Sequence, residues 1–468
     1  FDMITYAKGA SVLKQLVAWV GLEDFQAGLR QYFKDFAYGN SEFKDLLAAL
    51  EKASGRELSG WAHEWLQTAG VNTLTAEFEV DADGRYSSLA VRQTAHPDWP
   101  TLRRHRIGVG LYDEVDGRLV RRHYVETDVE GELTEIPELV AQQQPDLLLL
   151  NDGDLTYAKI RLDERSLATV VDGLSKLDDS LARALVWGAA WDMTRDAEMR
   201  ATDFVALALR NIGAETDSWG VSRIPSYAAQ AVNHFSAKAN RPQLRAEWER
   251  GLRELLGAAE AGSDHQLTFA RSYAGVAHSE AAVADLEGLL DGSLTFEGLA
   301  VDQDLRWVLL TALAAAGVAG EDRIDAELER DNTISGQEHA AAARAAQPTA
   351  EAKATAWEAA ITKTDTANET QRSIILSFQR PGQDDVLAPY VEHYLTAAED
   401  IWERLGTQRA STALEFIFPR QLASEELLAR VDAWLESSPA NPAAKRYVRE
   451  GRADVARALA AQERDGGE

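Results

Sequence analysis

The spacing of apolar residues changes twice along this chain, and these changes constrain the fold more than any other feature of the sequence. Before residue 73, apolar residues recur every three or four positions, as on the buried face of a helix. Over 73–160 they alternate with polar residues, and after about Arg161 the helical spacing returns and continues to the end. The sequence therefore predicts a multidomain, mainly α protein with one β segment.

The alternation is clearest at Leu74, Ala76, Phe78 and Val80, each of which follows a polar residue. Turn residues follow at 81–84, and alternation resumes at 86–93, 107–111 and 119–126. Residues 147–150 are a short apolar strand. Several short strands with this spacing are typical of a small β-sandwich, which we expect over 73–160.

The region after Arg161 is rich in alanine, and glycine or proline separates its helical segments. One such segment, 301–310, is followed by a loop at 317–320 and a further helix from about Asp322. Paired helices of this kind resemble HEAT or armadillo units, although no exact repeat is visible. We therefore expect a large α-helical, HEAT-like superhelical domain over 161–468.

Acidic residues outnumber basic ones, 76 against 48, which gives a net charge of −28 over 468 residues. This field repels phosphate backbones and anionic lipid, so we expect no nucleic-acid and no membrane partner. No apolar run approaches the ~20 residues that a membrane-spanning helix needs. The chain has no cysteine, which excludes disulfides and thiolate metal sites and fits a cytoplasmic protein. We expect it to be a monomer.

The first segment, 1–20, has the pattern of a helix with Asp2 as its N-cap and Tyr6, Gly9, Ala10, Leu13, Leu16, Val17 and Val20 on one face. A tyrosine on such a face is usually a core residue whose hydroxyl finds one partner. A phenol can also donate a hydrogen bond to a developing oxyanion. The spacing alone does not select between these two roles.

Two motifs lie at the ends of the first helical region. Residues 1–13 read Phe-Asp-x-Ile-Thr-Tyr-x-Lys-Gly-Ala-Ser-Val-Leu, and residues 61–70 read Trp-x-x-x-Trp-Leu-Gln-Thr-x-Gly. The first resembles the segment that follows the zinc site in the aminopeptidase N family of zinc metallopeptidases. The second resembles the end of the same catalytic domain. The resemblance implies that 1–72 is the helical end of a thermolysin-like catalytic domain. It also implies that Tyr6 is a catalytic residue, a transition-state stabiliser that donates to the tetrahedral intermediate.

The zinc motif of that family, His-Glu-x-x-His, is absent, because none of the nine histidines has a second histidine four positions later. His63-Glu64 begins the pattern without completing it, and we expect an ordinary helix surface pair. The chain also lacks the Gly-x-Met-Glu-Asn substrate motif and opens on Phe1. We therefore expect the C-terminal portion of such an enzyme, truncated after the zinc-binding motif. It would have no metal ligands of its own and no activity alone, and its substrate-binding residues are unknown.

The resemblance implies a parent enzyme that uses Zn²⁺ to release N-terminal amino acids from peptides. Its partners would be peptide substrates and the missing N-terminal part of the same protein. The alternative hypothesis is a non-enzymatic helical-repeat scaffold that binds peptides or proteins. The coding sequence upstream of Phe1 would distinguish the two.

Other candidate groups favour structural roles. The basic cluster of Arg103, Arg104, Arg106, Arg121 and Arg122 lies in the predicted strand region of an acidic protein, so we expect it to bind neighbouring carboxylates. His278 with Glu280, and Glu338 with His339, lie on polar helical stretches. We expect both to be surface helix pairs.

Overall fold

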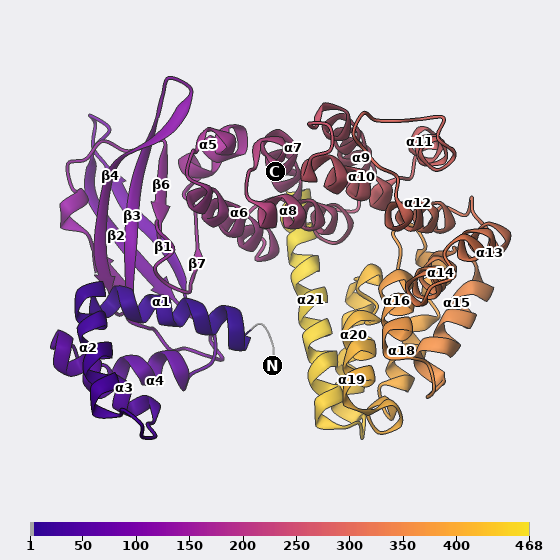
Figure 1. The fold of residues 1–468 in the computed structure, drawn as a ribbon. Coiled ribbons are helices and arrows are strands. Elements are labelled where there is room, and N and C mark those ends of the chain that lie inside the picture. Colours follow the sequence, from indigo (N-terminus) through magenta and orange to yellow (C-terminus); the bar gives the residue numbers. More distant parts are fainter. Residues whose placement is uncertain (1–3, 468) are drawn as a thin grey trace. The chain divides into compact units, whose positions relative to one another are not determined.

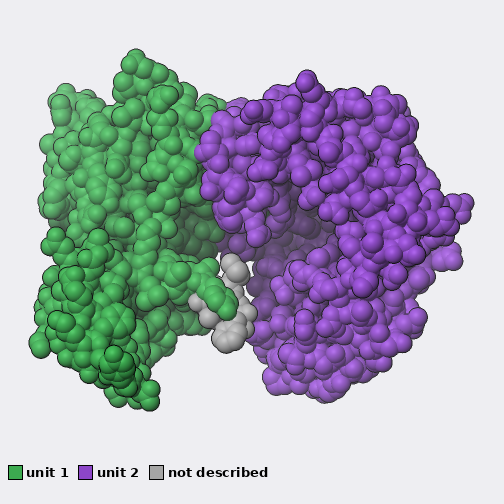
Figure 2. Space-filling view, in the orientation of Figure 1, with its two compact units in different colours: residues 1–193 green, residues 194–468 purple. Residues whose placement is uncertain are grey.

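The computed structural model describes residues 4–467. Contacts within the chain define two compact units, Phe1–Met193 and Thr194–Glu468 (Figures 1 and 2). The boundary falls inside a helix, and the predicted segments 1–72 and 73–160 belong to the same unit. The three predicted domains therefore remain a prediction. Among the described residues, we find no helix with the length and apolar character needed to cross a bilayer.

The first unit begins with one π-helical turn and four helices. They are η1 (Ile4–Lys8), α1 (Gly9–Val20), α2 (Leu22–Asp35), α3 (Phe43–Ser54) and α4 (Ser59–Leu66). Their shared core is made by α1, α3 and α4 around Leu16, Leu50, Trp61 and Trp65. The helices predicted over 1–70 are therefore confirmed.

The predicted buried face of the first helix is only partly right. Leu16 and Val20 are buried, but Leu13 is 52% exposed, and Trp19 is buried in its place. Trp19 removes more apolar surface from water than Leu13 could, so the helix turns that side toward the core. The predicted Asp2 cap lies outside the described residues.

Carboxylates lie at the starts of α3 and α4. The N-cap of α3 is Glu42, whose backbone N–H donates to the Asp45 carboxylate at 2.8 Å. Ser59 lies inside α4, and the Gly60 N–H there donates to Glu57 Oε1 at 2.8 Å. In both places a carboxylate accepts from a helix-start amide, where the helix dipole favours negative charge.

The alternating region forms two small sheets. The strands are β1 (Thr73–Val80), β2 (Tyr86–Thr94), β3 (His105–Val115), β4 (Arg118–Val129), β5 (Leu133–Glu135), β6 (Leu147–Leu150) and β7 (Lys159–Ile160). One sheet has the order β5-β2-β1-β7 and the other has the order β4-β3-β6. All four leucines of β6 are buried, as expected for a fully apolar strand.

Two glycines of β3 let the chain after β6 approach closely. The Asp152 N–H donates to Gly108 O at 3.0 Å, and a Cβ added at Gly108 would overlap the Asp152 carbonyl oxygen. At Gly110 an added Cβ would overlap the Asp152 carboxylate. That carboxylate is buried and accepts from the Tyr112 hydroxyl at 2.9 Å and from Arg121 at 3.1 Å.

The chain is helical from Glu164 on, as predicted. Helices α5 (Glu164–Gly173) and α6 (Ser180–Arg195) follow the sheets. The second unit contains α7 (Ala201–Asn211), α8 (Ser218–Gln230), α9 (Arg241–Ala258), α10 (Asp264–Val276), α11 (Glu280–Asp291), α12 (Gln303–Ala315), α13 (Glu321–Arg330), α14 (Ile334–Ala346), α15 (Ala350–Trp357), α16 (Asn368–Phe378), α17 (Asp384–Leu387), α18 (Tyr390–Ala397), α19 (Ile401–Phe416), α20 (Glu425–Ser437) and α21 (Pro442–Gly466). Helices close in sequence pack on one another, as α9 does on α10 and α14 on α16.

The last helix, α21, returns to the start of the second unit. Asp465, near its end, is fully buried and accepts from the backbone N–H groups of Thr202 and Ala237, both at 2.8 Å. Backbone amides from two distant segments therefore satisfy the buried Asp465 carboxylate near the end of α21. A helix end fixed by buried hydrogen bonds does not fray.

We predict that Gly108→Ala lowers the free energy of unfolding by about 1–3 kcal/mol, because a backbone oxygen stands where the new methyl group would go. Gly188→Ala is the control, because an added Cβ there meets nothing within 4 Å and α6 should gain up to ~1 kcal/mol of helix propensity. Urea unfolding measures both. A Gly108→Ala protein as stable as the parent would contradict the close approach.

Candidate functional site

Tyr6 lies in η1, the π-helical turn that leads into α1, and its side chain is 66% exposed. The interpretation of Tyr6 as a buried core residue is therefore wrong. Short π-helical turns are frequent at functional sites. Exposure leaves the phenol accessible to a bound molecule, and its catalytic role stays a prediction.

Lys8 follows Tyr6 by two residues and faces an aromatic ring. Its Nζ lies 5.7 Å from the centroid of the Tyr157 ring, which belongs to the loop after β6. Burial lowers the pKa of Lys8, and the charge of Arg103 lowers it further. The start of the helix thus holds an exposed phenol and a partly buried amine next to the 151–157 loop. Both groups can donate hydrogen bonds to carbonyl or carboxylate oxygens.

Helix α1 is fixed to the sheets by two polar side chains. Lys14 Nζ donates to Gly153 O at 3.0 Å and lies 3.5 Å from an Asp154 carboxylate oxygen. Gln15 is fully buried, and its Oε1 accepts from the Arg106 N–H at 3.2 Å. These contacts fix the position of α1, the helix that follows the η1 turn with Tyr6.

The loop that receives Lys14 has an unusual backbone. Asn151 and Asp154 both have positive φ, 56° and 54°, which suits Asn and Asp better than most residues. Asn151 Oδ1 accepts from the N–H groups of Leu155 and Thr156, both at 3.0 Å. Burial raises the pKa of the Asp154 carboxyl, and Lys14 opposes the shift.

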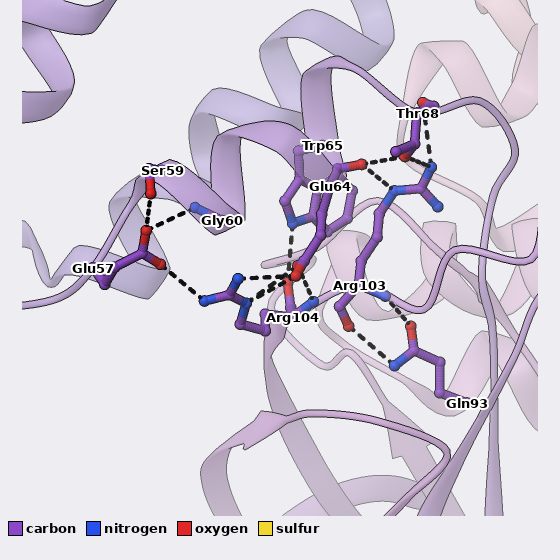
Figure 3. A network of polar contacts seen from close by, with 9 residues as sticks. All are labelled: Glu57, Ser59, Gly60, Glu64, Trp65, Thr68, Gln93, Arg103 and Arg104. Carbon is purple, nitrogen blue, oxygen red and sulfur yellow. Dashed lines mark hydrogen bonds and ion pairs between the residues drawn. The ribbon is translucent and has the colours of Figure 1, made fainter.

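Helix α4 is joined to the sheets through Arg103, which is only 2% exposed (Figure 3). Its Nε donates to Glu64 O at 2.9 Å, and Nη2 donates to Ala69 O at 2.9 Å. Nη1 donates to Asn72 Oδ1 at 3.0 Å. The carbonyls at a helix C-terminus lack partners within the helix and carry partial negative charge, so a guanidinium there satisfies both.

The neighbouring Arg104 binds carboxylates instead. Its Nη2 and Nε lie 2.9 and 3.0 Å from Glu64 Oε1, and its Nη1 lies 3.2 Å from Glu57 Oε2 (Figure 3). The expected helix surface position holds for His63, which is exposed, whereas Glu64 is partly buried in this ion pair. His63 contacts Gln67.

The prediction that the basic cluster binds carboxylates is confirmed for four of its five members. Arg104 binds Glu57 and Glu64, Arg106 binds Asp128, Arg121 binds Asp152 and Arg122 binds Asp113. Arg103 is the exception, since it binds carbonyl and amide oxygens. No local pattern in the sequence distinguishes Arg103 from Arg104.

His105 is buried beside Trp65, with ring centroids 5.1 Å apart. Its Nε2 lies 3.0 Å from Gln93 Oε1, so it carries the proton and donates. The Thr156 hydroxyl then donates to Nδ1 at 2.7 Å. Burial, with a smaller effect of Arg103, lowers the pKa of His105 to about 3. The imidazole is neutral, and both of its nitrogens are occupied.

The two histidine pairs expected on helix surfaces have other partners. The His278 ring lies 2.8 Å from a carboxylate oxygen of Glu249, and the His339 ring stacks on Trp307 at 5.9 Å. Within residues 4–467 no three His, Cys, Asp or Glu side chains are grouped so that they could hold a metal ion. The described residues therefore do not fit a zinc ion.

Comparison with known proteins gives the family. Residues 147–457 match the ERAP1-like C-terminal domain, and residues 1–65 match the peptidase family M1 domain. The chain belongs to the ERAP1-like C-terminal domain family. Its resemblance to the C-terminal portion of the aminopeptidase N family is thereby confirmed.

The relatives cover the chain to different extents. The chain is 48% identical to Aminopeptidase N of Streptomyces lividans over 99% of its own length and 55% of that protein. It is 25% identical to Tricorn protease-interacting factor F2 of Thermoplasma volcanium over 70% of its length and 38% of that protein. Aminopeptidase M1-A of Oryza sativa is 43% identical over 20% of the chain and 10% of that protein. The chain thus spans about half the length of the first of these relatives.

We predict that Arg103→Met lowers the free energy of unfolding by about 3 kcal/mol or more, because it leaves several buried carbonyl and amide oxygens without a donor. The control is Arg118→Met, whose side chain is 65% exposed in an ion pair with Asp178 and should cost less than ~1 kcal/mol. Urea unfolding followed by tryptophan fluorescence measures both. Equal losses in the two variants would refute the special role of Arg103.

Proposed function

We propose that this chain is the C-terminal portion of a zinc-dependent aminopeptidase that releases N-terminal amino acids from peptides. The observation that carries the proposal is the 48% identity with Aminopeptidase N across 99% of the chain. The match of residues 1–65 to the peptidase family M1 domain supports it, because that segment contains Tyr6.

The ligands of the metal would lie outside this chain, because the described residues do not fit a zinc ion. The contribution of the chain would be the Tyr6 hydroxyl. A donor held in place before the reaction stabilises an oxyanion because no reorganisation is needed as charge develops. Lys14 and Gln15 fix the helix that follows Tyr6 to the sheets, which supplies such a rigid support.

The domain organisation follows the same proposal. The segment 1–72 would be the helical end of a thermolysin-like catalytic domain, 73–160 a β-sandwich and 161–468 a HEAT-like superhelical domain. The two small sheets and the sequential packing of neighbouring helices support these assignments. We further propose a cytoplasmic monomer whose partners are peptides and the N-terminal part of the same protein.

We predict that Tyr6→Phe, made in the protein extended upstream to include the zinc motif, lowers turnover about 10²–10³-fold, as for loss of one oxyanion donor. The zinc content should not change, since Tyr6 is not a ligand in this proposal. Tyr38→Phe is the control, because that tyrosine is fully exposed outside the helices. Peptide hydrolysis and metal analysis of the three proteins test this, and full activity of Tyr6→Phe would remove Tyr6 from the mechanism.

We predict that residues 1–468 alone release no N-terminal amino acid from peptides and retain no zinc after dialysis. Elemental analysis and an aminopeptidase assay check both expectations. One tightly held zinc per chain would contradict the proposal, because it would show that zinc ligands lie within residues 1–468. If the upstream coding sequence also lacks a His-Glu-x-x-His motif, the non-enzymatic scaffold replaces the enzyme as the better proposal.

A further inference from the structure

The second unit contains a pocket of about 310 Å³ that no comparison assigns. It lies at the C-terminal ends of α10 and α12, next to α9 and the segment after α16. Its walls are mostly apolar and include Val232, Trp248, Val276 and Val283. Two arginines, Arg245 and Arg380, also line it. A largely apolar pocket with a few charged groups is the usual form of a small-molecule site.

Arg380 is poorly satisfied within the described structure. A guanidinium has five N–H donors, and that of Arg380 makes one hydrogen bond, from Nη2 to the Ser377 hydroxyl at 2.9 Å. Its Nε is buried without a partner. Among the described residues no carboxylate lies within ion-pair distance, and burial lowers the pKa of the group. Arg380 as a whole is partly buried, and a partly buried cation without a counter-charge is destabilising. A bound anion would supply that counter-charge.

Arg245, on α9, is the second cation of the pocket. Its Nη2 donates to Asn233 Oδ1 at 3.1 Å, and Asn233 also lines the pocket. Burial lowers the pKa of Arg245, and the charge of Asp384 opposes the shift without forming an ion pair. The electrostatic preference of the pocket is therefore for an anion, although Glu280 contributes one carboxylate to its lining.

The residues that line the pocket, and its volume, restrict the kind of anion that can bind. A guanidinium matches the planar geometry of a carboxylate, with two parallel N–H donors. The apolar side chains favour a ligand with an apolar body, and Glu280 disfavours a doubly charged phosphate. The volume of about 310 Å³ is at the lower end of the range for ligand sites, so the molecule is small.

We propose that this pocket binds a small monocarboxylic acid with an apolar body, whose carboxylate pairs with Arg380 and whose body contacts Trp248 and the valines. The carboxylate could belong to a free acid or to the C-terminal residue of a peptide. The inference is independent of the proposed peptidase activity, and its test measures binding only.

Isothermal titration of the full chain with N-acetyl-L-leucine tests the proposal, with N-acetyl-L-leucinamide as the uncharged analogue. We expect the acid to bind and the amide to bind at least about tenfold more weakly, since a charge-assisted hydrogen bond is lost. Arg380→Gln should weaken binding of the acid by a similar factor. Arg250→Gln is the matched control on α9, because that side chain is 69% exposed, and it should leave binding unchanged.

Equal binding of acid and amide, no binding of the acid, or unchanged binding in a folded Arg380→Gln protein would each overturn the proposal. If Arg380→Gln does not fold, Val318→Glu replaces it. Val318 lines the pocket and is 46% exposed, so a carboxylate is tolerated there and should repel the acid. Unchanged binding in Val318→Glu counts against the site. Titration with N-acetyl-Ala-Ala-Leu, as acid and as amide, distinguishes a free acid from the C-terminal residue of a peptide. Tighter binding of this peptide acid than of N-acetyl-L-leucine indicates that the pocket takes a peptide C-terminus.

Discussion

The first unit depends on the contact between the Arg103 guanidinium and two carbonyls, that of Glu64 in the last turn of α4 and that of Ala69 just after the helix. A helix ends with carbonyl groups that the helix itself cannot satisfy, and a buried helix end needs donors from elsewhere. Arg103 supplies them from the segment before β3 and is itself neutralised by partial charges instead of a carboxylate. Because α4 shares its core with α1, this contact acts together with those of Lys14 and Gln15 to position the helix that follows Tyr6. A purely apolar junction could slide, whereas donors and acceptors at fixed positions set one arrangement.

The same solution recurs at two other sets of buried polar groups in the first unit. His105, Gln93 and Thr156 satisfy one another in the middle of the first unit, and the Asp152 carboxylate is enclosed by a phenol and a guanidinium. Each of these sets joins segments that are far apart in the sequence. Arg380 differs from these sets, since its guanidinium makes one hydrogen bond and its Nε is buried without a partner. That contrast is the reason for assigning it a ligand.

The local periodicity of the sequence was enough to predict the helical regions and five of the seven strands, and it missed the short strands β5 and β7. The alternating segment Leu74–Val80 and the apolar run of β6 form strands, as predicted. Both could be recognised because the spacing of apolar residues in a strand follows from the local backbone geometry. The predictions that were wrong concerned residues whose surroundings are set by distant parts of the chain. Leu13 and Trp19 both suit a buried face, and only the packing against α3 and α4 selects Trp19. Likewise, Arg103 and Arg104 are adjacent and chemically identical, and their different partners come from the position of α4. The role of Tyr6 was inferred from resemblance, and the structure adds only that its side chain is exposed.

The return of α21 to the start of the second unit has a consequence for biosynthesis. Asp465 bonds to Thr202 and Ala237, which are made more than two hundred residues earlier. These amides therefore lack this partner until Asp465 has left the ribosome. The second unit can therefore close completely only after all of α21 has been made, whatever the N-terminal helices of the unit have already formed.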